Sequence, residues 1–204
     1  MPSTRVVRVD AAAPDLGVMG QAAQVLRNGG LLAFPTETFY GLGAAGLDAV
    51  AVRRVFAVKG RPASMPLLLL VDSRAMAASV ATEIPPRAGE LMARHWPGAL
   101  TLVLAAAPGV PAEVTAGTGT VGVRVPAHAV ARALVRALGE PVTAPSANPT
   151  GAPPPVTAGE VLAQLGGAID LILDAGATPG GTPSTVLDVT VDPPRVIRQG
   201  AVVV

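Results

Sequence analysis

Short apolar runs alternate with amphipathic helical segments along almost the whole chain of 204 residues. Such alternation is typical of an α/β domain, in which helices cover the faces of a sheet. The apolar runs predict strands at 4–9, 31–35, 67–71, 100–106 and 121–126, and the periodic segments predict helices at 14–30, from Asp48 to Val58, and at 128–138.

The strand signals at 184–191 and 195–200 follow each other with no helix between them, and the sequence "DPP" separates them as in a hairpin. A purely parallel sheet is therefore not expected, because parallel neighbours need a crossover connection. No charged or Ser/Gly-rich linker divides the chain. We predict a single α/β domain over residues 1–204, built on a twisted mixed β-sheet that helices flank.

The mean hydropathy of +0.50 raises the question of a membrane segment. The longest apolar runs, 65–71 and 98–110, are shorter than the ~18 residues of a spanning helix, and prolines interrupt or bound both. The N-terminal residues lack the apolar stretch of a secretory signal, and the chain has no cysteine. We therefore expect a cytoplasmic protein without disulfides, thiolate metal sites or a membrane partner.

The charge of the chain is nearly balanced, with a net charge of +1 and a pI of about 8.4. A dedicated nucleic-acid module is expected to have a pI above ~9 and aromatic residues for base stacking. This chain has only three Phe, one Tyr and one Trp. The composition therefore disfavours RNA binding as the main task, although an RNA-binding module remains an alternative.

Polar residues gather in six loops or strand ends, which is where α/β sheets bind ligands. These clusters are 35–43, 59–66, 118–126, 144–151, 180–186 and 197–200. None of them contains the phosphate-binding pattern G-x-x-x-x-G-K-[ST], and "GLG" and "GTG" lack the third glycine of a dinucleotide motif. The first cluster is a Gly-rich bend that carries Thr36, Glu37, Thr38 and Tyr40. Glu37 is either a base or an anchor for the loop backbone.

Two cations stand out. Lys59 is the single lysine among 15 basic residues, and Arg61 follows it across a glycine at the end of a predicted helix. Both are either solvated charges that complement the helix dipole or an anion site, which the scarcity of lysine favours. Arg124 points to the face of its strand opposite Val121 and Val123. It is either an exposed strand arginine or a clamp for a carboxylate or phosphate.

Ser146 and Asn148 follow a predicted buried strand and form either a plain turn or part of a site. A serine nucleophile would need a nearby base, for which His95 and His128 are the candidates, and the G-x-S-x-G pattern is missing. A serine hydrolase is thus disfavoured. No His/Asp/Glu cluster has metal-ligand spacing, so we expect Mg²⁺ only as a companion of bound phosphates.

Seven motifs, read in order from Phe34 to Gly200, resemble the YrdC-like family of threonylcarbamoyl-AMP synthases. They are "FPTETFYGLG", "KGRP", "HWPGALTLVL", "VGVRVPAH", "APSANPTG", "PSTVLDV" and "VIRQG". The resemblance implies a twisted sheet around a concave, positively charged cavity. It also implies that L-threonine, bicarbonate and ATP react to threonylcarbamoyl-AMP and pyrophosphate, for transfer to tRNA adenosine by separate tRNA-modifying proteins.

In this family the carboxylate of the threonine carbamate attacks the α-phosphate of ATP, so positioning and charge stabilisation suffice without a covalent nucleophile. By motif, Lys59 and Arg61 are implied to neutralise the ATP phosphates as catalytic residues. The nucleotide site is implied to comprise Lys59, Arg61, Thr120, Ser146, Asn148 and Arg198. The threonine site is implied to comprise Thr36, Thr38, Arg124 and Ser184, with Tyr40 shaping its wall.

The chain departs from the motifs of some members at "MPLLLL", where those members have "NPLIVH". Met65 and Leu70 then replace an Asn and a His, which puts local ligand contacts in doubt. The resemblance is to the short, single-domain form of the family. Two alternatives remain: the related domain of hydrogenase-maturation carbamoyltransferases, and an RNA-binding or ribosome-maturation module that uses the basic cavity.

Overall fold

Two mixed β-sheets form the protein, whose computed structural model describes residues 3–204. The first sheet has the order β1-β8-β2-β3, with β1 (Arg5–Arg8), β8 (Leu171–Asp174), β2 (Leu32–Pro35) and β3 (Tyr40–Gly43). Strands β1, β8 and β2 are parallel, whereas β3 turns back antiparallel to β2.

The second sheet has the order β10-β9-β5-β6-β4-β7. Its strands are β4 (Leu68–Leu70), β5 (Leu100–Ala105), β6 (Thr120–Arg124), β7 (Val142–Thr143), β9 (Thr185–Asp188) and β10 (Arg195–Arg198). Pairs β4/β6 and β5/β9 are parallel and the other pairs are antiparallel. The predicted mixed α/β class and the β9–β10 hairpin are confirmed.

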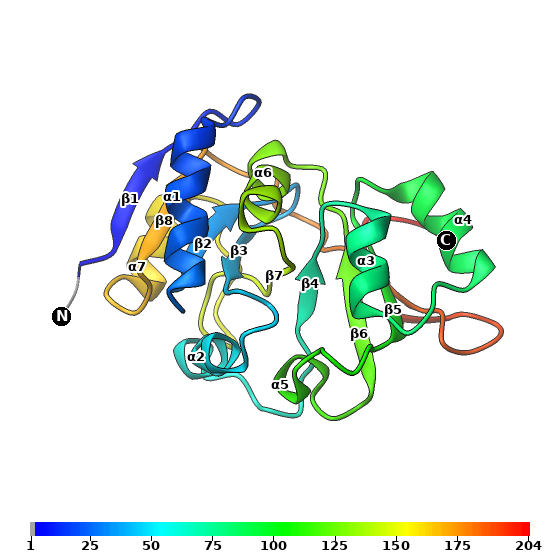
Figure 1. Ribbon diagram of the computed structural model, residues 1–204. Helices are drawn as coiled ribbons and strands as arrows, with labels where there is room; N and C mark the ends of the chain where they lie inside the picture. Colours follow the sequence, from blue (N-terminus) through cyan, green and yellow to red (C-terminus); the bar gives the residue numbers. More distant parts are fainter. Residues whose placement is uncertain (1–2) are drawn as a thin grey trace.

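Bridges connect the two sheets. Gly41 pairs with Ser146, and Ala45 pairs with Val142, so β3 runs beside β7. Figure 1 shows the first sheet on the left and the second on the right, with β3, β7 and β4 between them. The clusters 35–43 and 144–151, far apart in the sequence, are therefore neighbours at this junction.

Helices α1 (Leu16–Arg27) and α6 (Ala129–Leu138) pack together over the first sheet, and Figure 1 shows α1 crossing in front of β8 and β2. Their apolar sides share one core cluster with β2 and β7, including Met19, Leu26, Phe34, Leu134 and Val142. The other helices are α2 (Ala49–Lys59), α3 (Arg74–Val80), α4 (Pro86–His95), α5 (Ala112–Thr115) and α7 (Ala158–Leu165). They contribute to a second cluster around Leu42, Leu69 and Leu102.

Local signals set the bounds of α2 where the sequence predicts them. The Asp48 carboxylate accepts the N–H groups of Val50 and Ala51, which caps the first turn. Gly60 ends the helix with a φ of 57°, a left-handed conformation that favours glycine. Lys59 is consequently the last helical residue, and Arg61 leaves the helix in a fixed turn.

The expectation that residues 35–43 form a Gly-rich bend is wrong for its second half, because Tyr40–Gly43 is strand β3. A Cβ atom on Gly41 or Gly43 would come within 3.3 or 3.0 Å of the Phe34 ring on β2. These glycines therefore let the ring pack closely against β3 and do not serve to bend the chain. The turn itself is confined to residues 36–39.

Among residues 3–204, no helix combines the length and the apolar character needed to cross a membrane.

Candidate functional site

The turn between β2 and β3 is held by its own threonines. The Thr36 hydroxyl donates to the Phe39 carbonyl oxygen over 2.7 Å and lies 3.1 Å from the Thr38 hydroxyl. The Thr38 N–H donates to Thr36 Oγ1, and the Thr38 carbonyl accepts the N–H of Gly180 over 2.8 Å. Both threonines are buried. The turn is thus closed by its own hydrogen bonds and is tied to the loop that leads to Ser184.

Glu37 projects from this turn toward β6, where its Oε1 lies 3.2 Å from Nη1 of Arg124. Arg124 is only 3% exposed, so the alternative of an exposed strand arginine is wrong. Within residues 3–204, neither carboxylate oxygen of Glu37 has a hydrogen-bond partner, and Nε and Nη1 of Arg124 have none. The alternative of Glu37 as a backbone anchor is therefore also wrong, because its oxygens accept no loop N–H.

Charges of both signs act on Arg124. Burial lowers the pKa of Arg124, the Glu37 carboxylate opposes that shift, and the nearby positive charge of Arg198 adds to it. A buried guanidinium with free N–H groups can donate to a ligand group that supplies the missing acceptors.

Lys59 is buried, with 3% of its surface exposed, so a solvated surface cation is the wrong interpretation. Its ammonium donates to the main-chain carbonyl oxygens of Ser146 and Asn148. Burial, together with the charge of Arg61, lowers the pKa of Lys59 to about 8. An ammonium has three N–H donors, so one remains for a ligand.

Arg61 folds back over the loop that follows α2. Its Nε donates to the Met65 carbonyl oxygen over 3.2 Å and its Nη2 donates to that of Pro66 over 2.8 Å. Half-burial lowers the pKa of Arg61. The loop carbonyls thereby fix a second positive charge close to Lys59.

Ser146 and Asn148 contribute their main chain to this centre, and Asn148 also stabilises its own turn. The Asn148 side-chain amide donates to the carbonyl oxygens of Pro149 and Ala152, over 2.9 and 2.7 Å. Its Oδ1 is buried and accepts no hydrogen bond from the part of the chain that the structure describes. The turn interpretation therefore applies to the Asn148 amide nitrogen, and a ligand-binding role of its oxygen stays a prediction.

Ser184 and Arg198 meet at the start of the β9–β10 hairpin. The Arg198 guanidinium donates to the Ser184 carbonyl oxygen over 2.8 Å and to its hydroxyl over 3.0 Å. Gly200 makes this possible, because a Cβ atom there would lie 2.3 Å from the Pro183 carbonyl oxygen. The glycine of "VIRQG" thus lets the chain end pack on the Ser184 segment.

Tyr40 connects β3 to the loop after β8. Its side chain is fully buried, and its hydroxyl donates to the Gly176 carbonyl oxygen over 2.7 Å. Burial raises the pKa of Tyr40 to about 12. The phenol hydroxyl therefore holds the first residue of β3, which directly follows the turn 36–39, against the loop after β8.

Thr120, predicted to bind the nucleotide, makes no hydrogen bond to the other predicted site residues within 3–204. Its hydroxyl lies 2.9 Å from that of Thr118, at the opposite end of β6 from Arg124. At the two departures from the family motif, Met65 is exposed, whereas Leu70 is fully buried in the core next to Arg124 in the sheet.

One neighbour of the site, Thr101, escaped the sequence analysis, and His128 was considered there only as a base for Ser146. Thr101 lies on β5 with its hydroxyl 3.1 Å from that of Ser184, and a buried Thr in an apolar strand was the available signal. His128 caps α6 by accepting the Val130 N–H on Nδ1. Burial lowers the pKa of His128, and the nearby Glu37 charge opposes the shift.

In residues 3–204, no group of three or more His, Asp or Glu side chains is placed to hold a metal ion. Across the same residues, neither His95 nor His128 forms a hydrogen bond with Ser146.

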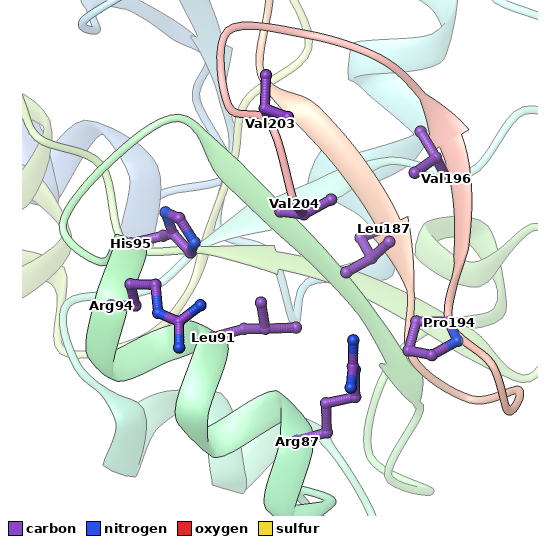
Figure 2. A pocket seen from close by; sticks show the side chains of 9 residues that line it. All are labelled: Arg87, Leu91, Arg94, His95, Leu187, Pro194, Val196, Val203 and Val204. Atoms are coloured by element: carbon purple, nitrogen blue, oxygen red, sulfur yellow. The ribbon is translucent and has the colours of Figure 1, made fainter.

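A separate pocket of about 320 Å³ opens between α4 and the β9–β10 hairpin. Figure 2 shows Arg87, Arg94 and His95 on one side and Leu187, Pro194 and Val196 on the other. None of the residues predicted to bind threonine or ATP lines it. The concave cavity implied by the resemblance is thus not this pocket and stays a prediction.

Comparison with known proteins relates the chain to one family. The family model of Sua5, YciO and YrdC proteins, described as "Telomere recombination", matches residues 24–200. A threonylcarbamoyl-AMP synthase of Pyrococcus abyssi is 48% identical over 179 residues, which are 88% of this chain and 53% of that protein. One of Bacillus subtilis is 43% identical over 185 residues, 90% of this chain and 54% of that protein.

The crystal structure of P. abyssi Sua5 complexed with L-threonine superposes with a TM-score of 0.93 at 44% identity. The match covers 97% of this chain and 58% of that one. The chain therefore spans about half the length of these relatives. The matched part includes every motif from Phe34 to Gly200. On these grounds the chain belongs to the Sua5/YciO/YrdC family.

Proposed function

We propose that this protein is a threonylcarbamoyl-AMP synthase, a nucleotidyltransferase that forms threonylcarbamoyl-AMP, pyrophosphate and water from L-threonine, bicarbonate and ATP. One observation carries the proposal: the buried Arg124 guanidinium has donors without acceptors in residues 3–204, beside a turn rich in hydroxyl groups. The names of the relatives and the threonine in the crystal structure of one of them support the same substrate.

In the proposed reaction, an oxygen of the threonine carbamate attacks the α-phosphorus of ATP. A new P–O bond forms, the bond between the α-phosphorus and the bridging oxygen breaks, and pyrophosphate leaves with that oxygen. Negative charge accumulates on the phosphoryl oxygens in the transition state. Lys59 and Arg61 are the catalytic residues that stabilise it, because carbonyl groups hold both cations in place before the substrate arrives.

The remaining roles are those that the family motifs imply. Thr120, Ser146, Asn148 and Arg198 bind the nucleotide, and Thr36, Thr38, Arg124 and Ser184 bind threonine. Mg²⁺ enters as part of the MgATP substrate. The product passes to separate tRNA-modifying proteins, which places the reaction in the cytoplasm, and any affinity of this chain for RNA is weak and secondary.

Pyrophosphate release tests the proposal. Purified protein, MgATP and bicarbonate are incubated with L-threonine, with L-serine or without an amino acid. We expect rapid release only with threonine and only when bicarbonate is present. Release that does not depend on threonine would remove the substrate assignment, and no release under any of these conditions would remove the reaction.

A further inference from the structure

The Glu37 carboxylate is buried and has no hydrogen-bond donor among residues 3–204. Its side chain is 17% exposed, both of its oxygens are buried, and neither accepts a hydrogen bond from residues 3–204. A buried carboxylate without hydrogen bonds is costly, so such a group in a site indicates a ligand that supplies donors.

The turn that carries Glu37 does not need its carboxylate. Thr36 and Thr38 close the turn through their hydroxyl and main-chain groups, with Phe39 as the acceptor. The carboxylate is therefore free for another task, and its only close charge partner within 3–204 is Arg124, at 3.2 Å.

The pair with Arg124 satisfies charge but not hydrogen bonding. Nη1 and Nε of Arg124 and both oxygens of Glu37 all lack hydrogen-bond partners in the described chain, although the two groups nearly touch. A guanidinium with free donors thus lies beside a carboxylate with free acceptors. The pair has no net charge, so it does not attract a simple anion strongly.

An α-amino acid matches this arrangement, because it carries a carboxylate and an ammonium group on the same carbon atom. We propose that Glu37 and Arg124 form a zwitterion clamp: Arg124 donates to the carboxylate of threonine, and Glu37 accepts hydrogen bonds from its α-amino nitrogen. This inference rests on the proposed function and assigns Glu37 as a further substrate-binding residue of the same site.

The other charged groups near the clamp do not replace the ligand. His128 is close enough to feel the charge of Glu37, but its Nδ1 accepts the Val130 N–H, and burial favours the neutral imidazole. Arg198 directs its guanidinium to Ser184. Glu37 therefore has one cationic neighbour in contact and unused acceptor capacity.

The test compares two ligands on the full chain by calorimetry. The first is L-threonine, and the second is the 2,3-dihydroxybutanoate of the same configuration, in which a hydroxyl replaces the α-amino group. We expect the wild-type protein to prefer threonine by about 10- to 100-fold, the range for hydrogen bonds between charged groups. In Glu37→Gln, threonine affinity should fall by a similar factor, while the affinity for the dihydroxy acid stays equal or rises.

The fall in threonine affinity without a fall in affinity for the dihydroxy acid separates the clamp from a simpler role. If Glu37 only neutralised Arg124, Glu37→Gln would free the guanidinium and strengthen both ligands equally, which would overturn the inference. Unchanged affinities would overturn it as well. Glu90→Gln, at an exposed position of α4, is the matched control and should leave both affinities as in the wild type.

Two further measurements keep the result interpretable. Glu37→Asp retains the charge, so partial recovery of the preference for threonine is expected if the folded protein uses the carboxylate as an acceptor. A full loss in Glu37→Asp, at an unchanged melting temperature, would count against the clamp. If the wild-type protein releases pyrophosphate but Glu37→Gln still prefers threonine over the dihydroxy acid, the clamp is overturned and the proposed function stands. If the wild-type protein binds no threonine, both the clamp and the proposed function are overturned.

Discussion

Lys59 and Arg124 are both buried cations, each 3% exposed, but the protein treats their charges differently. Lys59 is held by the carbonyl oxygens of Ser146 and Asn148, whose dipoles stabilise the ammonium without cancelling its charge. Arg124 faces the carboxylate of Glu37, which does cancel its charge. The Lys59 region therefore stays positive and suits a polyphosphate, whereas the Glu37–Arg124 pair is neutral and suits a zwitterion.

The largest effect is expected for Lys59→Ala. Removal of the ammonium from a site where phosphoryl charge develops should lower the turnover of pyrophosphate release by about 10²–10³-fold. The change also leaves two carbonyl oxygens without their donor, so the melting temperature must be measured in parallel. Arg53→Ala, at an exposed position of the same helix, is the control. A rate near that of the wild type would mean that Lys59 only stabilises the loop of Ser146 and Asn148.

Arg124→Ala tests whether the neutral Glu37–Arg124 pair binds threonine. Threonine affinity should fall by about 10- to 100-fold, because the ligand carboxylate loses charge-assisted hydrogen bonds. ATP affinity should change much less, since the phosphates are assigned to the Lys59 region. Calorimetry with each substrate separates the two effects, and Arg136→Ala at an exposed position of α6 is the control. If threonine and ATP lost affinity equally, Arg124 would not be specific to the threonine site, and the distinction between the two regions would be wrong.

A pH series sharpens the difference between the two cations. The pKa of Lys59 is lowered to about 8, so its charge is present below that pH and is lost as the pH rises through it. From pH 7 to 9, ATP affinity should therefore fall by up to about tenfold, if only the ammonium form binds. Lys59→Arg keeps its charge over this range and should remove the dependence. A wild-type affinity that stays constant would contradict the role of the ammonium.

The smallest effect is expected for Arg198→Ala. Its guanidinium is partly exposed and binds Ser184, so water screens its contribution to phosphate binding. ATP affinity should weaken by only a few-fold in calorimetry. The control is Arg195→Ala in the same hairpin, whose side chain pairs with Asp188. A loss as large as that of Lys59→Ala would move Arg198 into the centre of the nucleotide site.

Much of the fold was predictable because its signals are local. The cap at Asp48, the stop at Gly60 and the hairpin between β9 and β10 each depend on residues a few positions apart. Strand β3 was missed for the opposite reason. Gly41 and Gly43 are needed for contact with Phe34 of β2, and glycine in isolation indicates a bend.

The candidate site divides in the same way. The scarcity of lysine pointed to Lys59, and strand alternation placed Arg124 on the face opposite its valine neighbours. Neither pattern could tell that both cations are buried or what compensates each charge. Glu37 remained open between base and anchor, and the structure rejects the anchor because its oxygens accept no hydrogen bond within residues 3–204.

The sequence by itself determined most of the helices and strands, the motifs and the identity of the charged side chains. The tertiary structure alone decided which partners those charges have: carbonyl groups from the β7 loop for Lys59, and a carboxylate from the β2–β3 turn for Arg124. Burial and pairing depend on residues brought together from distant parts of the chain, and the free energy of a charge depends on those surroundings more than on its neighbours in sequence.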